Sequence, residues 1–208
     1  MGRLQATLEE SDHAYSTAGE FAGDIRLIHD SLLENRGEHA GLFGVKRLLR
    51  RIETFGFHLV TLDVRQDALL HRRLMGELLG CDDWEARDPA HRAATLAHLL
   101  QSDSLPQSSP YDDVSDEAAE TLAVFRAISS ARQMYGSGAI GLFIISMTQG
   151  ADDVLTTLAL SEIANPHTGA SSQLDIAPLL ETVDDLQAGP AIIDDLLQQP
   201  FYRKHVSN

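Results

Sequence analysis

Three short runs of apolar and β-branched residues, each followed by a segment with helical spacing, constrain the possible fold of this chain most strongly. The runs occupy residues 57–64, 139–147 and 174–180. The third run contains Pro178, which cannot donate a backbone hydrogen bond to a sheet and so weakens that assignment. Buried strands that alternate with helices predict a helix-rich α/β architecture with parallel strands. Three strands are too few to close a barrel, so a barrel fold would be only partly present in this chain.

The spacing of apolar residues predicts helices before and between these strands. The predicted helices occupy residues 20–35, 42–55, 70–78, 89–100, 115–135 and 152–164. Two short helices should follow the third strand, and Pro190 should begin the second of them. Residues 101–113 hold two prolines and four serines and are expected to form a loop. We expect residues 1–19 to form a tail or connector and residues 20–208 to form part of one domain.

The composition excludes several classes of protein. A net charge of −15 repels nucleic acid and anionic membranes, so any anion site must be built locally from arginines or a metal ion. Cys81 is the only cysteine in the sequence, which excludes an intramolecular disulfide and a cysteine-based zinc site and fits a cytoplasmic protein. No run approaches the roughly 18 apolar residues of a membrane helix. Residues 1–10 lack the apolar centre of a signal peptide.

Gly136, Gly138 and Gly141 form a G-x-G-x-x-G pattern. A dinucleotide site needs this pattern after a strand and before a helix, whereas here it follows a predicted helix and precedes a predicted strand. We therefore interpret the glycines as a helix stop. The nine histidines include no pair with clear metal-ligand spacing. We expect His58 to be a hydrogen-bonded core residue, and His71 to lie at the surface or in a site.

Five Asp-Asp pairs begin at residues 82, 112, 152, 184 and 194. Most of them lie where a helix is predicted to begin. Capping of the helix and stabilisation of its dipole therefore explain them without a ligand. None of the pairs has the spacing of a calcium-binding loop.

Two positions favour a functional interpretation because they lie where strands are predicted to end. Asp63 and Arg65 fall on the same side of the first strand near its carboxyl end, where the reactive groups of α/β barrels lie. Arg65 could bind a phosphate or carboxylate through two parallel hydrogen bonds, and the alternative is a structural ion pair of Asp63 with Arg65 or another neighbour. Glu181 follows the third strand directly. It could bind a hard cation, or it could help to cap the next helix after Thr182.

Three segments of the sequence, the third of them continued by residues 202–205, resemble phosphoenolpyruvate carboxylases. The segments are 55–66 (FGFHLVTLDVRQ), 144–149 (IISMTQ) followed by 153–155 (DVL), and 174–186 (LDIAPLLETVDDL) with its continuation 202–205 (YRKH). They occur in the order found in that family and with plausible separations, so that the resemblance covers about residues 20–206. Together they are far more specific than any one of them alone.

The resemblance implies a partial (β/α) TIM-like barrel with additional helices and a carboxy-lyase reaction. Phosphoenolpyruvate and bicarbonate would give oxaloacetate and phosphate, with Mg2+ or Mn2+ as the cofactor. Arg65 matches the family's phosphate-binding arginine, and Glu181 matches a glutamate that ligates the divalent metal. The resemblance also implies that the partners are the remainder of a carboxylase chain and further copies of it in a homo-oligomer. Neither nucleic acid nor a membrane is an expected partner.

The sequence departs from the family pattern at Ala68 and Asp152, where family members usually carry serine. The family's catalytic histidine is expected upstream of this segment. A second metal-binding aspartate and a glycine- and arginine-rich loop are expected downstream. We therefore expect an internal fragment that is inactive alone. The alternatives are a non-catalytic remnant of the same fold, or another metal-dependent barrel enzyme that acts on a phosphorylated or keto acid.

Overall fold

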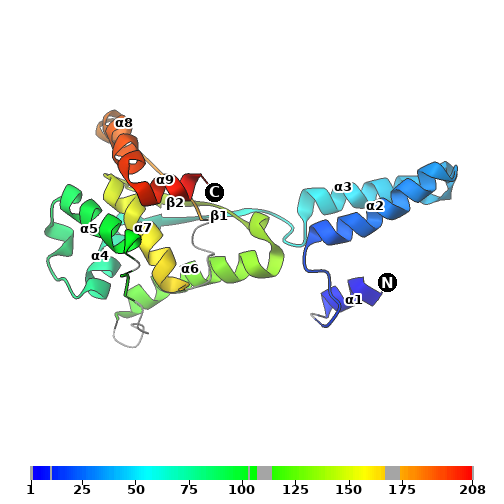
Figure 1. Cartoon of the computed structure of the whole chain (residues 1–208), viewed down its shortest axis with the longest axis horizontal. Helices are drawn as coiled ribbons and strands as arrows, with labels where there is room; N and C mark the ends of the chain where they lie inside the picture. Colours follow the sequence, from blue (N-terminus) through cyan, green and yellow to red (C-terminus); the bar gives the residue numbers. More distant parts are fainter. Residues whose placement is uncertain (1, 10, 103, 107–113, 167–173, 208) are drawn as a thin grey trace. The chain divides into compact units, whose positions relative to one another are not determined.

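The computed structural model describes residues 2–9, 11–102, 104–106, 114–166 and 174–207 of the 208-residue chain (Figure 1). The chain divides into two units, which we call the hairpin unit and the sheet unit. The hairpin unit comprises Met1–Leu62 and Ala131–Ile140, and the sheet unit comprises Asp63–Ser130 and Gly141–Asn208. Most of the loop predicted at residues 101–113 lies outside the described residues, as does the Asp pair that begins at residue 112.

The hairpin unit is built from the helices α1 (Gly2–Leu8), α2 (Ala18–Glu34) and α3 (Phe43–Phe55) and the turn η1 (Glu38–Leu42). Helices α2 and α3 begin and end close to where the spacing predicts, whereas no helix was predicted at α1 or at η1. The Thr17 side chain caps α2 by accepting a hydrogen bond from the backbone N–H of Glu20. The helices α2 and α3 run side by side (Figure 1) and bury an apolar core between them. This core comprises Phe21, Ala22, Leu49 and Ile52.

The sheet has three strands in the order β1-β2-β3, namely β1 (Leu62–Asp67), β2 (Ile140–Ser146) and β3 (Asp175–Pro178). Strands β2 and β3 pair in parallel, with Leu142 opposite Asp175 and Ile145 opposite Pro178. Side-chain bonds from β1 to Leu142 and Ser146 show that β1 runs in the same direction as β2. Pro178 is tolerated because it is the last residue of a strand at the edge of this sheet.

The prediction of a first strand at residues 57–64, buried on both faces, was wrong in position and in burial. Strand β1 begins only at Leu62, and the preceding Leu59 and Val60 are 71% and 58% exposed. Phe57 packs against the core of the hairpin unit instead of entering the sheet. Backbone bonds back to Phe55 and His58 form a turn in this segment. The apolar run therefore serves two structural elements rather than one strand.

The remaining helices and short turns are α4 (Ala68–Leu79), η2 (Trp84–Ala86), α5 (Pro89–Gln101), α6 (Asp116–Tyr135), η4 (Ser137–Ala139), α7 (Ala151–Ala164), α8 (Val183–Gln198) and α9 (Pro200–Val206). Of these, α4, α5, α6 and α7 agree with the prediction, whereas the short turns η2 and η4 were not predicted. Asp67, Asp88 and Ser115 cap α4, α5 and α6. Helix α7 is buried along its length apart from Glu162 and packs against α4, α5 and α8.

The prediction of two short helices divided at Pro190 was wrong, because α8 continues through this proline. Thr182 and Asp185 form a capping box that starts the helix. Ile192 and Leu196 are buried beyond the proline, so packing of this face offsets the one lost backbone hydrogen bond. The second helix is α9, which begins at Pro200.

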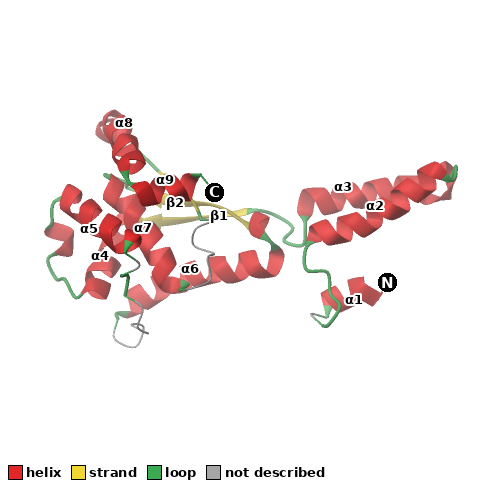
Figure 2. Cartoon of the chain, in the orientation of Figure 1, coloured by secondary structure: helices red, strands yellow, loops and turns green. Residues whose placement is uncertain are grey.

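Within the described residues the sheet does not close into a barrel, and the fold is a helix-rich α/β structure with short strands (Figure 2). No helix in the described part of the chain is both long enough and apolar enough to cross a membrane.

Gly136 connects α6 to η4 with φ 96° and ψ 164°, a backbone conformation open almost only to glycine. We expect Gly136→Ala to lower the free energy of unfolding by about 1–3 kcal/mol. The matched control is Gly23→Ala inside α2, where a new Cβ meets no atom within 4 Å. This control should raise the stability by about 0.4–1 kcal/mol. Urea denaturation measures both changes, and an unaltered stability for Gly136→Ala would contradict the helix-stop interpretation.

Candidate functional site

Arg65 and Glu181 meet within the sheet unit, although 116 positions separate them in the sequence. The Arg65 Nη2 donates a hydrogen bond to Glu181 Oε1 at 2.7 Å. The other carboxylate oxygen, Oε2, accepts a hydrogen bond from the backbone N–H of Met147 at 3.3 Å. The Arg65 side chain is 57% exposed and the Glu181 side chain 29% exposed, so both groups are accessible to a ligand.

The sheet topology explains why these residues meet. Met147 follows the last residue of β2, and Glu181 follows β3 after a short connection. Because β2 and β3 are parallel, both segments emerge at the same edge of the sheet. Arg65 reaches this edge from within β1, which extends to Asp67 rather than ending at residue 64 as the sequence pattern predicted.

Arg65 forms an ion pair, but its partner is Glu181 rather than Asp63, and Glu181 does not cap the next helix. Asp63 does not pair with Arg65 but accepts a hydrogen bond from the backbone N–H of Leu142 at 2.8 Å. Glu181 precedes Thr182, the capping residue of α8, and the reciprocal cap is made by Asp185. The carboxylate of Glu181 is therefore directed to the sheet edge rather than to the helix terminus.

The described residues offer an incomplete set of ligands for a metal ion. Nowhere in the described ranges do three or more His, Cys, Asp or Glu side chains converge in a way that could hold one. At the sheet edge Glu181 supplies one carboxylate, whose oxygens face Arg65 and the N–H of Met147. Mg2+ prefers about six oxygen ligands in octahedral geometry, several of which are often waters.

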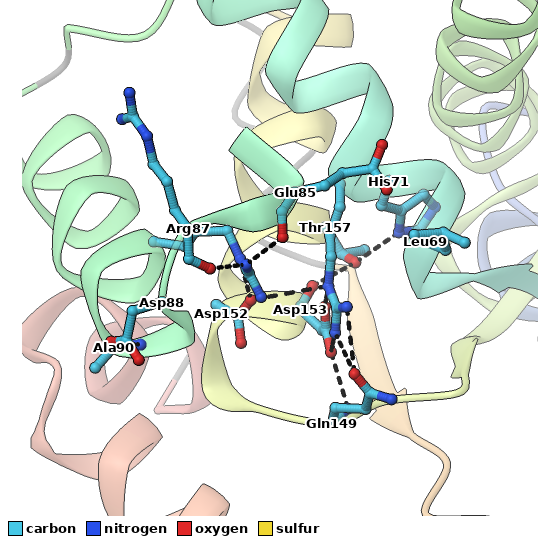
Figure 3. Close-up of polar contacts among 12 residues, drawn as sticks. Leu69, His71, Glu85, Arg87, Asp88, Ala90, Gln149, Asp152, Asp153 and Thr157 are labelled. Atoms are coloured by element: carbon cyan, nitrogen blue, oxygen red, sulfur yellow. Dashed lines mark hydrogen bonds and ion pairs between the residues drawn. The ribbon is translucent and has the colours of Figure 1, made fainter. Parts of the chain in front are cut away.

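A buried network of charges lies at the start of α7, close to this edge (Figure 3). Asp152 and Asp153 are 1% and 0% exposed. Arg72 binds Asp153 through two hydrogen bonds, from Nε at 2.6 Å and from Nη2 at 2.7 Å. Arg92 Nε donates to Asp152 Oδ2 at 2.8 Å. The side chain of Gln149 accepts from Arg72, and its backbone N–H donates to Asp153 Oδ2.

Helix capping alone was therefore the wrong explanation for the acidic pair at residue 152. The two carboxylates are buried and neutralise two arginines that come from α4 and α5. The arginine partners could not be identified from the local sequence, because they lie 81 and 60 positions away. The only indication of buried charges in the sequence was a pair of aspartates at the start of an otherwise apolar segment.

The other acidic pairs divide between capping and surface contacts. The pair at residue 184 lies in the first turn of α8, as predicted, and Asp185 takes part in its capping box. The pair at residue 194 lies near the end of α8, so that capping was the wrong explanation there. Asp83 forms an exposed ion pair with Arg87.

His71 is fully buried, which rules out the surface alternative for this histidine. Its Nδ1 lies 3.0 Å from Thr157 Oγ1, and its Nε2 lies 3.0 Å from Gln66 Oε1. The ring also contacts the rings of Phe125 and Phe143. His71 thus ties Gln66, the neighbour of Arg65, to α7, which indicates a role in positioning β1.

His58 and Ala68 complete the candidates raised by the sequence. The Nδ1 atom of His58 is buried and has no hydrogen-bond partner among the described residues, contrary to the expected hydrogen-bonded core histidine. The ring lies beside Gly56 and Gly138, where an added Cβ would meet it. Ala68 is buried as the first residue of α4.

Comparison with known proteins identifies the relatives of this chain. The family model for phosphoenolpyruvate carboxylase matches residues 2–208. The chain is 46% identical over 208 residues to a phosphoenolpyruvate carboxylase of Xanthomonas oryzae pv. oryzae, covering 99% of this chain and 22% of the relative. It is 37% identical over 213 residues to a phosphoenolpyruvate carboxylase of Rhodopseudomonas palustris, again covering 99% of this chain and 22% of the relative. The chain thus spans about a fifth of the length of these relatives.

The buried His71 makes the stability of the protein depend on pH. Burial lowers the pKa of His71 from 6.5 to about 4, although the nearby Asp153 and Asp67 oppose this change. The unfolded chain therefore binds a proton between pH 6.5 and pH 4 that the folded chain does not. We expect a loss of up to about 3 kcal/mol of unfolding free energy as the pH falls through this window.

The measurement is urea denaturation at pH 7 and at pH 4.5 for the native protein and for His71→Gln. The difference between the two proteins isolates the histidine, because all carboxylates titrate in both. Exposed His98, replaced by Gln, serves as the control and should leave the pH dependence unchanged. An equal pH dependence for the native protein and His71→Gln would contradict a neutral His71 in the folded state.

Proposed function

We propose, from the premise that the chain belongs to the phosphoenolpyruvate carboxylase family, that it supplies part of the active site of such an enzyme. The observation that carries the proposal is the contact between Arg65 and Glu181 at the carboxyl edge of a parallel sheet. Reactive groups of α/β enzymes lie at this edge. A cation next to a carboxylate fits a site that must hold both an anionic phosphate and a metal ion.

Arg65 is suited to bind the phosphate of phosphoenolpyruvate. A guanidinium has five N–H donors, and the hydrogen bond to Glu181 uses one of them. The exposed side chain leaves others free to donate to two phosphate oxygens at once. The net charge of −15 repels anionic substrates over the chain as a whole, so a fixed local cation is needed to hold one.

The reaction that we propose begins when a bicarbonate oxygen attacks the phosphorus of phosphoenolpyruvate. The bond between phosphorus and the enol oxygen breaks, which gives carboxyphosphate and the enolate of pyruvate. Carboxyphosphate then releases carbon dioxide and phosphate, and the methylene carbon of the enolate attacks the carbon dioxide to give oxaloacetate. Arg65 would stabilise the negative charge on the phosphoryl oxygens during the first step.

We propose Glu181 as one ligand of Mg2+ or Mn2+, with the other ligands supplied by the rest of the protein. Such a cation, once bound, would supply Lewis-acid stabilisation of the enolate oxygen. The exposed position of Glu181 and its acceptor-only carboxylate support this role. Within this chain, Glu181 would also orient the Arg65 side chain before the substrate binds, and the hydrogen bond between them supports this role.

The same premise supports wider proposals about the intact protein. We propose that the three strands belong to a TIM-like barrel, which further strands outside this chain complete. The partners would be the remaining carboxylase chain and other copies of it in a homo-oligomer. We further propose a cytoplasmic location, in keeping with the single cysteine.

The 208-residue chain alone should not form oxaloacetate from phosphoenolpyruvate and bicarbonate in the presence of Mn2+. The physical reason is that a cation held by Glu181 without further protein ligands binds weakly. An assay that reduces oxaloacetate to malate and follows the loss of NADH measures the turnover. Turnover by the chain alone would refute the proposal that its active site is incomplete.

A segment exchange tests the role of Arg65 in a complete enzyme. Residues 2–208 replace the matching segment of the Xanthomonas oryzae relative, which is 46% identical. We expect the hybrid to be active, and Arg65→Ala to lower its kcat/KM for phosphoenolpyruvate about a thousandfold, because a charged donor to the phosphoryl oxygens is lost. Arg65→Lys should recover part of this loss, because it keeps the charge but not the two-point hydrogen bonding.

The matched control in the same hybrid is Arg73→Ala. Arg73 is an exposed arginine of α4 that pairs with Glu85 at 3.5 Å, away from the sheet edge. Its removal should leave kcat/KM close to that of the hybrid. Full activity of Arg65→Ala would disprove the phosphate-binding role. A folded but inactive hybrid would favour the non-catalytic remnant.

A further inference from the structure

Three hydrogen bonds at the edge of the sheet belong to a closed ring that includes Arg65. Two of them join Arg65 to Glu181 and Glu181 to the backbone N–H of Met147. The third runs from Ser146 Oγ to the backbone carbonyl of Gln66 at 3.1 Å. Gln66 follows Arg65 in the chain and Ser146 precedes Met147, so the backbone closes the ring. A shift of β1 along β2 would therefore disturb the contact between Arg65 and Glu181.

The side chain of Gln66 is held a second time, by a buried histidine. Gln66 Oε1 lies 3.0 Å from His71 Nε2. The other ring nitrogen, Nδ1, lies 3.0 Å from Thr157 Oγ1 of α7 (Figure 3). Burial lowers the pKa of His71 to about 4, so the ring is neutral at pH 7, with one donor and one acceptor nitrogen. An amide and a hydroxyl can each donate or accept, so Gln66 and Thr157 satisfy the ring in either tautomer.

His71 is itself anchored in the core of the sheet unit. Its side chain is fully buried. The centroid of its ring lies 5.7 Å from that of Phe125 in α6 and 5.6 Å from that of Phe143 in β2. The rings of Phe125 and Phe143 stack on one another with their centroids 5.0 Å apart. Closely packed side chains do not shift independently, so the contact with His71 ties the end of β1 to this core.

Gln66 and Arg65 point to opposite faces of β1, because successive side chains of a strand alternate. The Gln66 side chain reaches His71 of α4, whereas the Arg65 side chain reaches Glu181 at the sheet edge. Arg65 is 57% exposed, and the residue next to it is fastened to a fully buried one. A two-point contact with a phosphate needs a fixed origin for the long arginine side chain, since a misplacement of about 1 Å can cost about a hundredfold in rate.

We propose that Gln66 and Ser146 are positioning residues, which hold the end of β1 so that the Arg65 guanidinium is placed to bind the phosphoryl oxygens of the substrate. This inference rests on the proposed function and deepens it. Neither residue is expected to touch the substrate, because the Gln66 amide faces His71 and the Ser146 hydroxyl donates to the Gln66 carbonyl. Both belong to the segments 55–66 and 144–149 that resemble the carboxylase family.

NMR of the arginine Nε–H groups in the 208-residue chain tests the positioning directly. The proton–nitrogen heteronuclear NOE reports how freely each group moves on the picosecond to nanosecond timescale. In the native chain the value for Arg65 should exceed the value for Arg47, an exposed arginine of α3. Gln66→Met and Ser146→Ala each remove one contact that holds β1, and both should lower the Arg65 value toward that of Arg47.

The hybrid enzyme that carries residues 2–208 tests whether this placement matters for the reaction. Gln66→Met and Ser146→Ala should each lower kcat/KM for phosphoenolpyruvate about tenfold. In a hybrid that already carries Arg65→Ala, the same changes should lower it less than about twofold, because they act through Arg65. A purely structural role would lower the activity by the same factor in both hybrids.

Three matched variants serve as controls. Ser146→Thr keeps a hydroxyl at this position and should recover most of the activity that Ser146→Ala loses. Ser161→Ala removes the hydroxyl of another buried serine, near the end of α7. Gln198→Met removes an amide that bonds to Asp194 in α8. These last two variants should leave the NOE of Arg65 and the kcat/KM of the hybrid unchanged.

Equal NOE values for Arg65 and Arg47 in the native chain would overturn the proposal, and so would an unchanged Arg65 value in both variants. Equal kinetic losses with and without Arg65→Ala would also overturn it, since Gln66 and Ser146 would then act on the fold alone. Full activity of Arg65→Ala would instead refute the proposed function, and the NOE comparison would still decide the positioning. Ser146→Ala removes a single oxygen atom, so it stays decisive even if Gln66→Met does not fold.

Discussion

The pairing of Arg72 and Arg92 with Asp152 and Asp153 is the interaction on which the sheet unit depends most. Two positive and two negative side chains meet where water is largely excluded. Removing one member of such a group leaves an uncompensated charge and costs about 3–5 kcal/mol. Helices α4, α5 and α7 are thus fixed relative to one another, because the buried charges are compensated only when all four side chains are in place.

This network also determines where the candidate site lies. Its aspartates are in the first turn of α7, and the backbone N–H of Gln149 is bound by Asp153. The connection between β2 and α7 is therefore held at both ends, by the sheet and by the charges. Met147 lies within this connection with φ 58°, and its N–H reaches Glu181. A conformation so unusual for methionine persists because both flanks are fixed, and it directs a donor at the carboxylate beside Arg65.

The sequence predicted the parts of the fold that depend on local chemistry. Helix limits followed from the spacing of apolar residues, as for α5 and α6, and the α/β class followed from the alternation of strands and helices. The start of β1 was missed because Phe57 belongs to a different core, and the continuity of α8 was missed because its burial beyond Pro190 is a tertiary effect. The periodicity of apolar residues indicates which face of a segment is buried, but not which other segment packs against it.

The same distinction explains what could be foreseen of the site. The meeting of Arg65 with Glu181 is a consequence of parallel strands, whose carboxyl ends share one edge, and the prediction of parallel strands had placed both residues near strand ends. The arginine partners of Asp152 and Asp153 come from helices whose docking no local pattern encodes. Residues at strand ends can thus be predicted from topology, whereas a buried charge network requires the packed structure. The charge network holds the connection that contains Met147, and Met147 donates to Glu181. The network, which could not be predicted, therefore supports the contact between Arg65 and Glu181, which could.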